Sequence, residues 1–156
     1  MRLPPSSLAV VVAVACSTEP LLAPPSPELR DAPEEVTVDG LSVRLETYLW
    51  RDFQPVAPPD GQPLIAVLRV MTTDGTPVPP TLHADQAWVI ADGVSWAASV
   101  REEQGRVAGS PSFEVVARDG PKWGPGIAVD VVIRLRASSG APVLLSARGQ
   151  SIHRTE

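Results

Sequence analysis

The chain contains one cysteine, Cys16, so no disulfide can form within it. Histidine is almost as scarce, because only His83 and His153 occur and they lie 70 residues apart. Metal sites need convergent His, Cys, Asp or Glu side chains. We therefore expect neither a disulfide-stapled scaffold nor a metal centre, and no cofactor.

Basic residues are also fewer than acidic residues. Lys and Arg number 13 against 18 Asp and Glu, which gives a formal net charge of -5 at pH 7. Binding to nucleic acid rests on clustered Lys and Arg that neutralise phosphates. We therefore expect no nucleic-acid partner.

The N-terminal stretch has the layout of a secretory signal. Arg2 supplies a positive charge, and a run of eight apolar residues ends in the small-residue site Ala13-Val14-Ala15. A membrane-spanning helix needs roughly 20 apolar residues, so this run is too short to be one. We predict that residues 1–15 are a signal peptide, cleaved between Ala15 and Cys16.

The tetrad Ala13-Val14-Ala15-Cys16 resembles the lipobox of bacterial lipoproteins, although that family favours Leu where Ala13 stands. In that family the exposed cysteine is acylated on its sulfur and its amine. The resemblance implies a Cys16 carrying fatty acids and a protein anchored in the cell envelope, on the periplasmic face of the outer membrane in a Gram-negative cell. Two or more acyl chains give stable anchoring. The alternative is an ordinary secretory signal, which would leave a soluble protein with a free thiol.

The residues after the cysteine are rich in proline and acidic side chains. Such a tract buries too little apolar surface to fold, and its prolines favour an extended conformation of about 3.1 Å per residue. We predict that residues 16–35 form a lipid-anchored tether of at most about 60 Å. One folded domain follows over residues 36–156.

This domain is patterned for strands. Apolar and polar residues alternate over 41–49 and 127–135, and 18 prolines argue against long helices. About seven strands separated by Gly and Pro turns predict an all-β fold, an antiparallel immunoglobulin-like β-sandwich without the Cys-Trp-Cys framework of antibody domains. A small β-barrel is the alternative.

Two Asp-Gly pairs carry local predictions. Asp92-Gly93 predicts a tight hairpin in which Val89 lies opposite Trp96, with Trp96 in the core and Trp88 half exposed. Asp39-Gly40 is either a tight turn or a bulge, and we favour a bulge or kink, because residues 36–38 are too few to pair along the whole of the next strand. Residues 101–111 are polar and glycine-containing and predict a mobile loop.

The most distinctive stretch after the signal peptide is residues 119–126, which read Asp-Gly-Pro-Lys-Trp-Gly-Pro-Gly. This loop would present Lys122 and Trp123 at one end of the sandwich, where binding loops usually lie. Tyr48 and Trp50 form a second aromatic cluster that would extend the site if the two lay side by side. The alternative is that Trp123 plugs the open end of the core.

Catalytic residues are difficult to assemble from this sequence. Ser112, His83 and an aspartate could be drawn as a triad, but no nucleophile elbow accompanies them. His83 with Met71 could be imagined as copper ligands, and a solvated loop histidine is the simpler interpretation. We expect no catalytic site and therefore no enzyme.

The sequence thus favours a cell-envelope lipoprotein whose domain is a non-catalytic interaction module for another envelope protein. A second hypothesis is a module that binds glycans or small ligands through Trp123 and the Tyr48/Trp50 cluster. A third, an enzyme, requires a cleft in which His83 lies beside a carboxylate.

Overall fold

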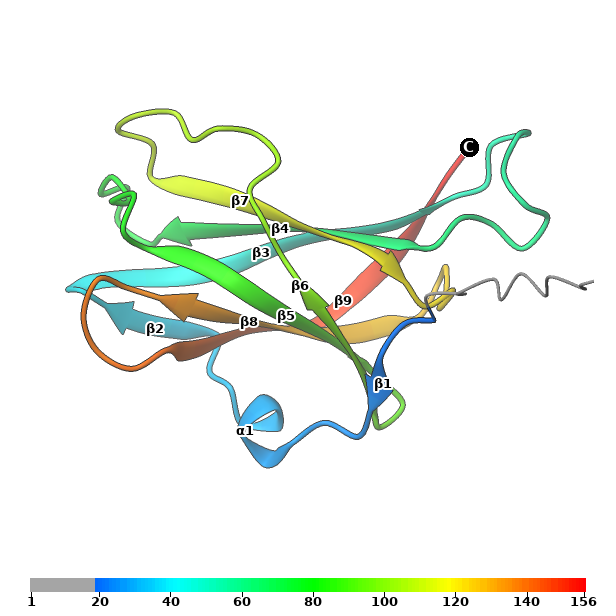
Figure 1. Ribbon diagram of the computed structural model, residues 1–156, viewed down its shortest axis with the longest axis horizontal. Coiled ribbons are helices and arrows are strands. Elements are labelled where there is room, and N and C mark those ends of the chain that lie inside the picture. Colours follow the sequence, from blue (N-terminus) through cyan, green and yellow to red (C-terminus); the bar gives the residue numbers. More distant parts are fainter. Residues whose placement is uncertain (1–18) are drawn as a thin grey trace, which may run out of the picture.

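A computed structural model describes residues 19–156 and shows an all-β protein, as predicted (Figure 1). The predictions for the signal peptide and for Ala15 and Cys16 concern residues outside this range. No helix within residues 19–156 has the length and apolar character needed to cross a bilayer. The elements are β1 (Leu22–Ala23), α1 (Pro27–Arg30), β2 (Glu35–Val38), β3 (Leu41–Asp52), β4 (Leu64–Thr72), β5 (His83–Ala91), β6 (Val94–Ser99), β7 (Ser112–Gly120), β8 (Ala128–Arg136) and β9 (Val143–Thr155).

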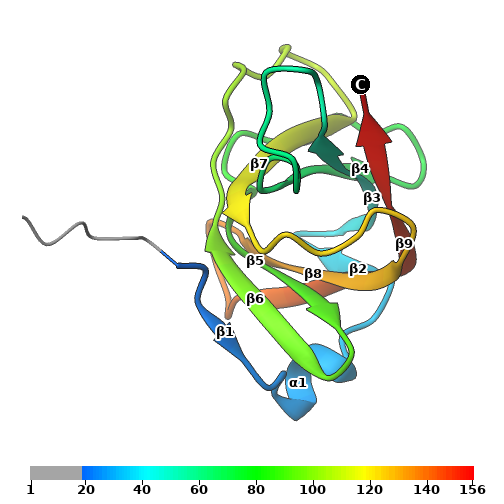
Figure 2. The ribbon, with the colours of Figure 1, turned by 90° about the vertical axis from the view of Figure 1, so that its right-hand side faces the viewer.

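The strands form one mixed sheet in the order β1-β6-β5-β8-β9-β3-β4-β7, with β2 paired to β3. Figure 2 shows this sheet curled into a half-barrel. The pairs are antiparallel apart from β3 and β9, which run parallel, so the expectation of a purely antiparallel fold is wrong there. The reason is the length of β9: it pairs with β8 as far as Ser151 and then continues along β3 from Ile152 to Thr155.

The core lies inside the curl. Alternate residues of β8, from Val129 to Leu135, are buried, as the period-two pattern predicts. Trp96 is buried as well, and its ring packs so closely on Gly120 that an added Cβ would lie 2.7 Å from it. Near this contact the amide of Val116 donates to the carbonyl oxygen of Arg101 at 3.0 Å, which links β7 to the chain that follows β6.

The hairpin between β5 and β6 has the predicted register, with Val89 opposite Trp96. The interpretation of Asp39-Gly40 as a bulge is wrong. Both residues have positive φ, 49° and 78°, and they form the tight turn of a hairpin between β2 and β3. The turn forms because four residues of β2 are enough to pair with the start of β3.

The stretch predicted to be an extended tether lies against the sheet from Leu22 onward. Strand β1 pairs with the outer edge of β6. Helix α1 buries Leu29 against Val132 on the outer face of the sheet. The hydroxyl of Ser146 donates to the carbonyl oxygen of Ala32 at 2.7 Å, which holds the residues after the helix.

Candidate functional site

A groove of about 830 Å³ opens between the N-terminal residues and the loop after β7. Its apolar wall is made by Leu22 and three prolines, Pro20, Pro63 and Pro121. Lys122, one of the predicted binding residues, lies exposed at its rim and forms an ion pair with Asp60 at 2.7 Å. We call this part of the half-barrel, with residues 19–22, 53–63 and 119–126, the groove end.

A single buried arginine fixes the loops at the groove end. Arg51 is 3% exposed, and within residues 19–156 its guanidinium donates only to backbone carbonyl oxygens. The acceptors are those of Gln62 (2.9 Å), Lys122 (3.1 Å), Gly124 (2.8 Å) and Asp60. Burial lowers the pKa of Arg51, and the negative charge of Asp60 opposes this effect. The guanidinium stays protonated and joins two loops whose residues Asp60 and Lys122 lie 62 positions apart in the sequence.

Arg51 was missed as a structural residue, although the sequence carries a signal for it. Along β3, Val43, Leu45 and Leu49 point into the core, and Arg51 has the same parity. A charged residue at an inward-facing position needs hydrogen-bond partners. Loops rich in proline supply such partners, because their carbonyl oxygens are not used in a sheet ladder.

The predicted aromatic residues do not form one patch. Trp123 is half-buried and packs against the core, as a plug would. Tyr48 is exposed and stacks on His153, with ring centroids 5.3 Å apart. Trp50 lines a hollow of about 220 Å³ that shares Pro63 and Asp119 with the groove. Among residues 19–156, neither aromatic stacking nor a hydrogen bond joins Trp123 to Tyr48 or Trp50.

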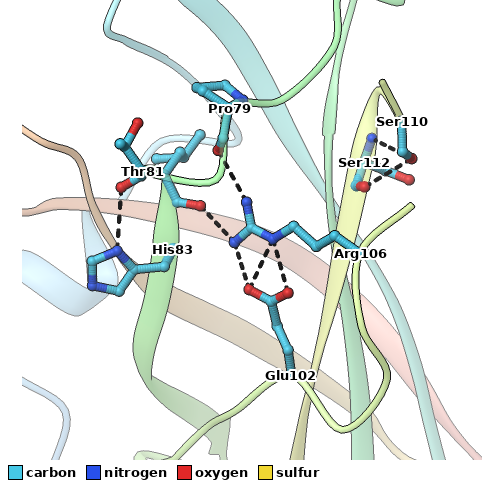
Figure 3. A network of polar contacts seen from close by, with 8 residues as sticks. Pro79, Thr81, His83, Glu102, Arg106, Ser110 and Ser112 are labelled. Atoms are coloured by element: carbon cyan, nitrogen blue, oxygen red, sulfur yellow. Dashed lines mark hydrogen bonds and ion pairs between the residues drawn. The ribbon is translucent and has the colours of Figure 1, made fainter. Parts of the chain in front are cut away.

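A second built feature is the loop 101–111 between β6 and β7, shown in Figure 3. The Arg106 side chain donates to both oxygens of Glu102 and to the carbonyl oxygens of Pro79 (3.0 Å) and Leu82 (2.6 Å). Its guanidinium also lies 4.0 Å from the centroid of the Phe113 ring. The loop predicted to be mobile is thus fastened at several points, and we call this part of the molecule the loop end.

Immediately after Arg106 the loop exposes an aliphatic side chain. Val107 is 76% exposed. It borders a hollow of about 260 Å³ whose lining includes Val78 and Pro80. Sequence reasoning missed this residue, because a valine in a polar loop gives no signal until its neighbour is known to be fixed.

The residues considered for catalysis lie apart. His83 is exposed, with Nδ1 3.3 Å from the carbonyl oxygen of Thr81, and Figure 3 places it on the other side of Arg106 from Ser112. Within the described range, no hydrogen bond joins His83 to a carboxylate or to Ser112. Residues 19–156 also contain no group of three or more His, Cys, Asp and Glu that could hold a metal ion.

Two of the carboxylates with a lowered pKa, Asp60 and Asp85, belong to ion pairs. Arg134 donates to Asp85 at 2.7 and 3.0 Å, and this bond lowers the pKa of Asp85, with a further contribution from Arg136. The hydrogen bond from Lys122 likewise lowers the pKa of Asp60. A general acid at neutral pH needs a raised pKa, so these two carboxyl groups are suited to structural pairing.

Within the described residues, the half-barrel therefore has two ends with ordered loops. Arg51 fixes the loops of the groove end, and Arg106 fixes the loop end. No protein-family model, no curated protein and no solved structure matches this chain.

Proposed function

We propose that the chain is a cell-envelope lipoprotein, cleaved before Cys16 and acylated there, whose β-domain is a non-catalytic interaction module for another envelope protein. The observation that carries the interaction role is the fastened loop end with its exposed Val107. In Figure 1 this loop lies far along the molecule from β1. A domain anchored through its N-terminus would present the loop away from the membrane.

Preorganisation makes this loop suitable for binding. Ordering a loop on association costs free energy, and a loop that is already held avoids much of that cost. An exposed aliphatic side chain beside a hollow is the kind of contact that anchors protein interfaces. The charges around it are matched within the chain, since Glu102 pairs with Arg106 and Glu103 pairs with Arg118 at 2.7 Å. Among the described residues that line the hollow beside Val107, the one charged side chain, Arg106, is therefore paired.

The finer architecture that we propose is the immunoglobulin-like sandwich. Its support is β9, which leaves β8 at Ser151 and joins β3 from Ile152 onward. Strands that switch sheets in this way make the corners of packed sheets. The link between Val116 and Arg101 supports the small-barrel alternative instead, because it brings the two ends of the curl together.

The anchor is tested on the mature protein isolated from its own membrane. We expect its intact mass to include acyl chains on Cys16, and we expect Cys16→Ser to move the protein into the soluble fraction. A mature chain without acyl mass would remove the lipoprotein part of the proposal and leave a secreted module.

The interaction role is tested by Val107→Asp in the acylated protein, with affinity capture and crosslinking in envelope membranes. We expect the variant to lose the captured partner while its unfolding midpoint stays unchanged. The matched control is Val56→Asp, which changes a 92% exposed valine at the groove end and should keep the partner. Equal capture by both variants would contradict a role for the loop end.

A further inference from the structure

We infer that the groove end of the half-barrel lies on the surface of the lipid bilayer, with Leu21 and Leu22 in contact with lipid. The inference rests on the proposed acylation of Cys16 and goes beyond it, because acylation alone does not place any surface of the domain on the bilayer.

The first step concerns distance. The amide of Ala97 donates to the carbonyl oxygen of Leu21 at 3.3 Å, and Leu22 pairs with Trp96, so the chain is held on the sheet from Leu21 onward. Five residue steps separate Cys16 from Leu21. An extended chain covers at most about 3.6 Å per residue, which limits this span to about 18 Å. An acylated Cys16 would therefore keep the groove end close to the bilayer, within a fraction of the reach that the predicted tether would have given.

The second step concerns the surface that this short connection brings to the bilayer. Leu21 is 73% exposed and Leu22 is 47% exposed. Leu22 shares the groove wall with the half-buried Pro20 and Pro63, so its exposed apolar surface extends into the groove. Apolar side chains beside a lipid anchor add to membrane binding through the area that they bury.

The third step concerns charge and selects the kind of lipid. The titratable groups around the groove are Glu19, Asp119 and Lys122. Lys122 already pairs with Asp60, whose carboxylate adds to the negative side. Binding to anionic lipid depends on clusters of Lys and Arg, which are absent from this groove wall. The surface therefore suits zwitterionic headgroups, and contact is driven by the leucines and prolines.

The experiment uses the scarcity of cysteine in this chain. In the acylated protein the Cys16 thiol is blocked, so Leu21→Cys supplies the one thiol that an environment-sensitive fluorophore can label. The labelled protein is placed in phosphatidylcholine vesicles that carry a quencher on the acyl chains near the headgroups. Val107→Cys, labelled in the same way, reports on the loop end. Circular dichroism verifies that both exposed positions tolerate the change.

We expect a blue-shifted emission and the loss of most of the intensity for the label at position 21, with little quenching at position 107. Equal quenching at both positions, or none at position 21 while the protein is vesicle-bound, would overturn the inference. A blue shift without quenching would mean that a second copy of the chain covers the groove, and this result would overturn it too. Failure of the proposed acylation is recognised separately, because the protein would then lack acyl mass and would not float with the vesicles.

Discussion

Arg51 places its charge among four backbone carbonyl oxygens, and no carboxylate forms an ion pair with it among the described residues. Its partners come from the two loops of the groove end. Truncation would leave several of these oxygens buried without a donor, which costs about 1 to 3 kcal/mol for each group. Arg51 therefore holds the two loops in the positions that shape the groove.

We predict that Arg51→Ala lowers the free energy of unfolding by about 3 kcal/mol, because the loops lose their shared donor. The free energy of unfolding of Arg51→Lys should lie between those of Arg51→Ala and the wild type, since one ammonium group cannot donate to all four acceptors. Urea unfolding measures the change. The matched control is Arg44→Ala, an exposed arginine paired with Glu46, which should stay within about 0.5 kcal/mol. A similar loss in both variants would contradict the role given to Arg51.

Asp85 provides a pH-dependent prediction. Its hydrogen bonds from Arg134 and Arg136 lower its pKa in the folded state. A lowered folded pKa stabilises the fold above the unfolded carboxyl pKa of about 3.9, and this contribution disappears as the pH falls through the folded value. Asp85→Asn should therefore be less stable than the wild type at pH 7, with a difference that shrinks below about pH 4. Urea midpoints across pH measure it, and a difference independent of pH would count against the ion pair.

The structural positions of some residues could be predicted from the sequence, and those of others could not. Trp96 was predicted in the core because its position follows from a two-residue turn only three residues away. The alternation along its strand marks Arg51 as inward-facing, but the backbone acceptors of Arg51 and Arg106 could not be predicted, because they lie in other loops whose positions depend on the whole fold. Of the candidate site, the sequence located the 119–126 loop and Lys122, and it could not show that Tyr48 and Trp50 lie apart from Trp123.

Strand pairings, like single residues, could be predicted where the partners are close in the sequence and could not where they are distant. The hairpin of β5 and β6 is local, so its period-two pattern and turn determine the register. The parallel pair of β3 and β9 joins residues about 100 positions apart, and parallel pairing carries no turn signal. Helix α1 was missed because five prolines and five acidic residues dominate the composition around Leu29 and Ala32, which are buried together with Pro25.

We predict that Leu29→Ala detaches the N-terminal segment from the sheet while the half-barrel stays folded. A buried leucine contributes about 2 to 3 kcal/mol, which is large for a segment with one turn of helix and a two-residue strand. Proteolysis should cut residues 24–34 faster, and the Ala97 amide, which donates to Leu21, should exchange faster with solvent. Leu21→Ala, at an exposed position, should leave both rates unchanged. Unfolding of the whole chain by Leu29→Ala would show that the segment is not a separate unit.

At the scale of the whole molecule, residues 152–155 at the end of β9 join two parts of the sheet. One part contains β1, β6, β5 and β8, and the other contains β2, β3, β4 and β7. We predict that a chain ending at Ser151 shows no cooperative urea transition, because it lacks buried Ile152 and the pairing with β3. It also lacks the carbonyl oxygen of Thr155, which accepts from the amide of Phe53 at 2.9 Å. A chain ending at Thr155 is the control and should unfold like the wild type. Cooperative unfolding of the shorter chain would show that the core alone joins the two parts.

The docking of the N-terminal segment also constrains the order in which parts of the chain fold. Leu22 pairs with Trp96, and Ala32 accepts from Ser146, 114 residues further along the chain. Closing such long loops is slow, because their entropy must be lost before any contact compensates for it. Ala32 therefore waits for nearly the entire chain before it can dock, and Leu22 waits until Trp96 has been made. Until then the outer edge of β6 is bare, and an uncovered sheet edge is where another chain can add a strand. A newly made molecule is consequently most vulnerable to self-association just before its N-terminus settles.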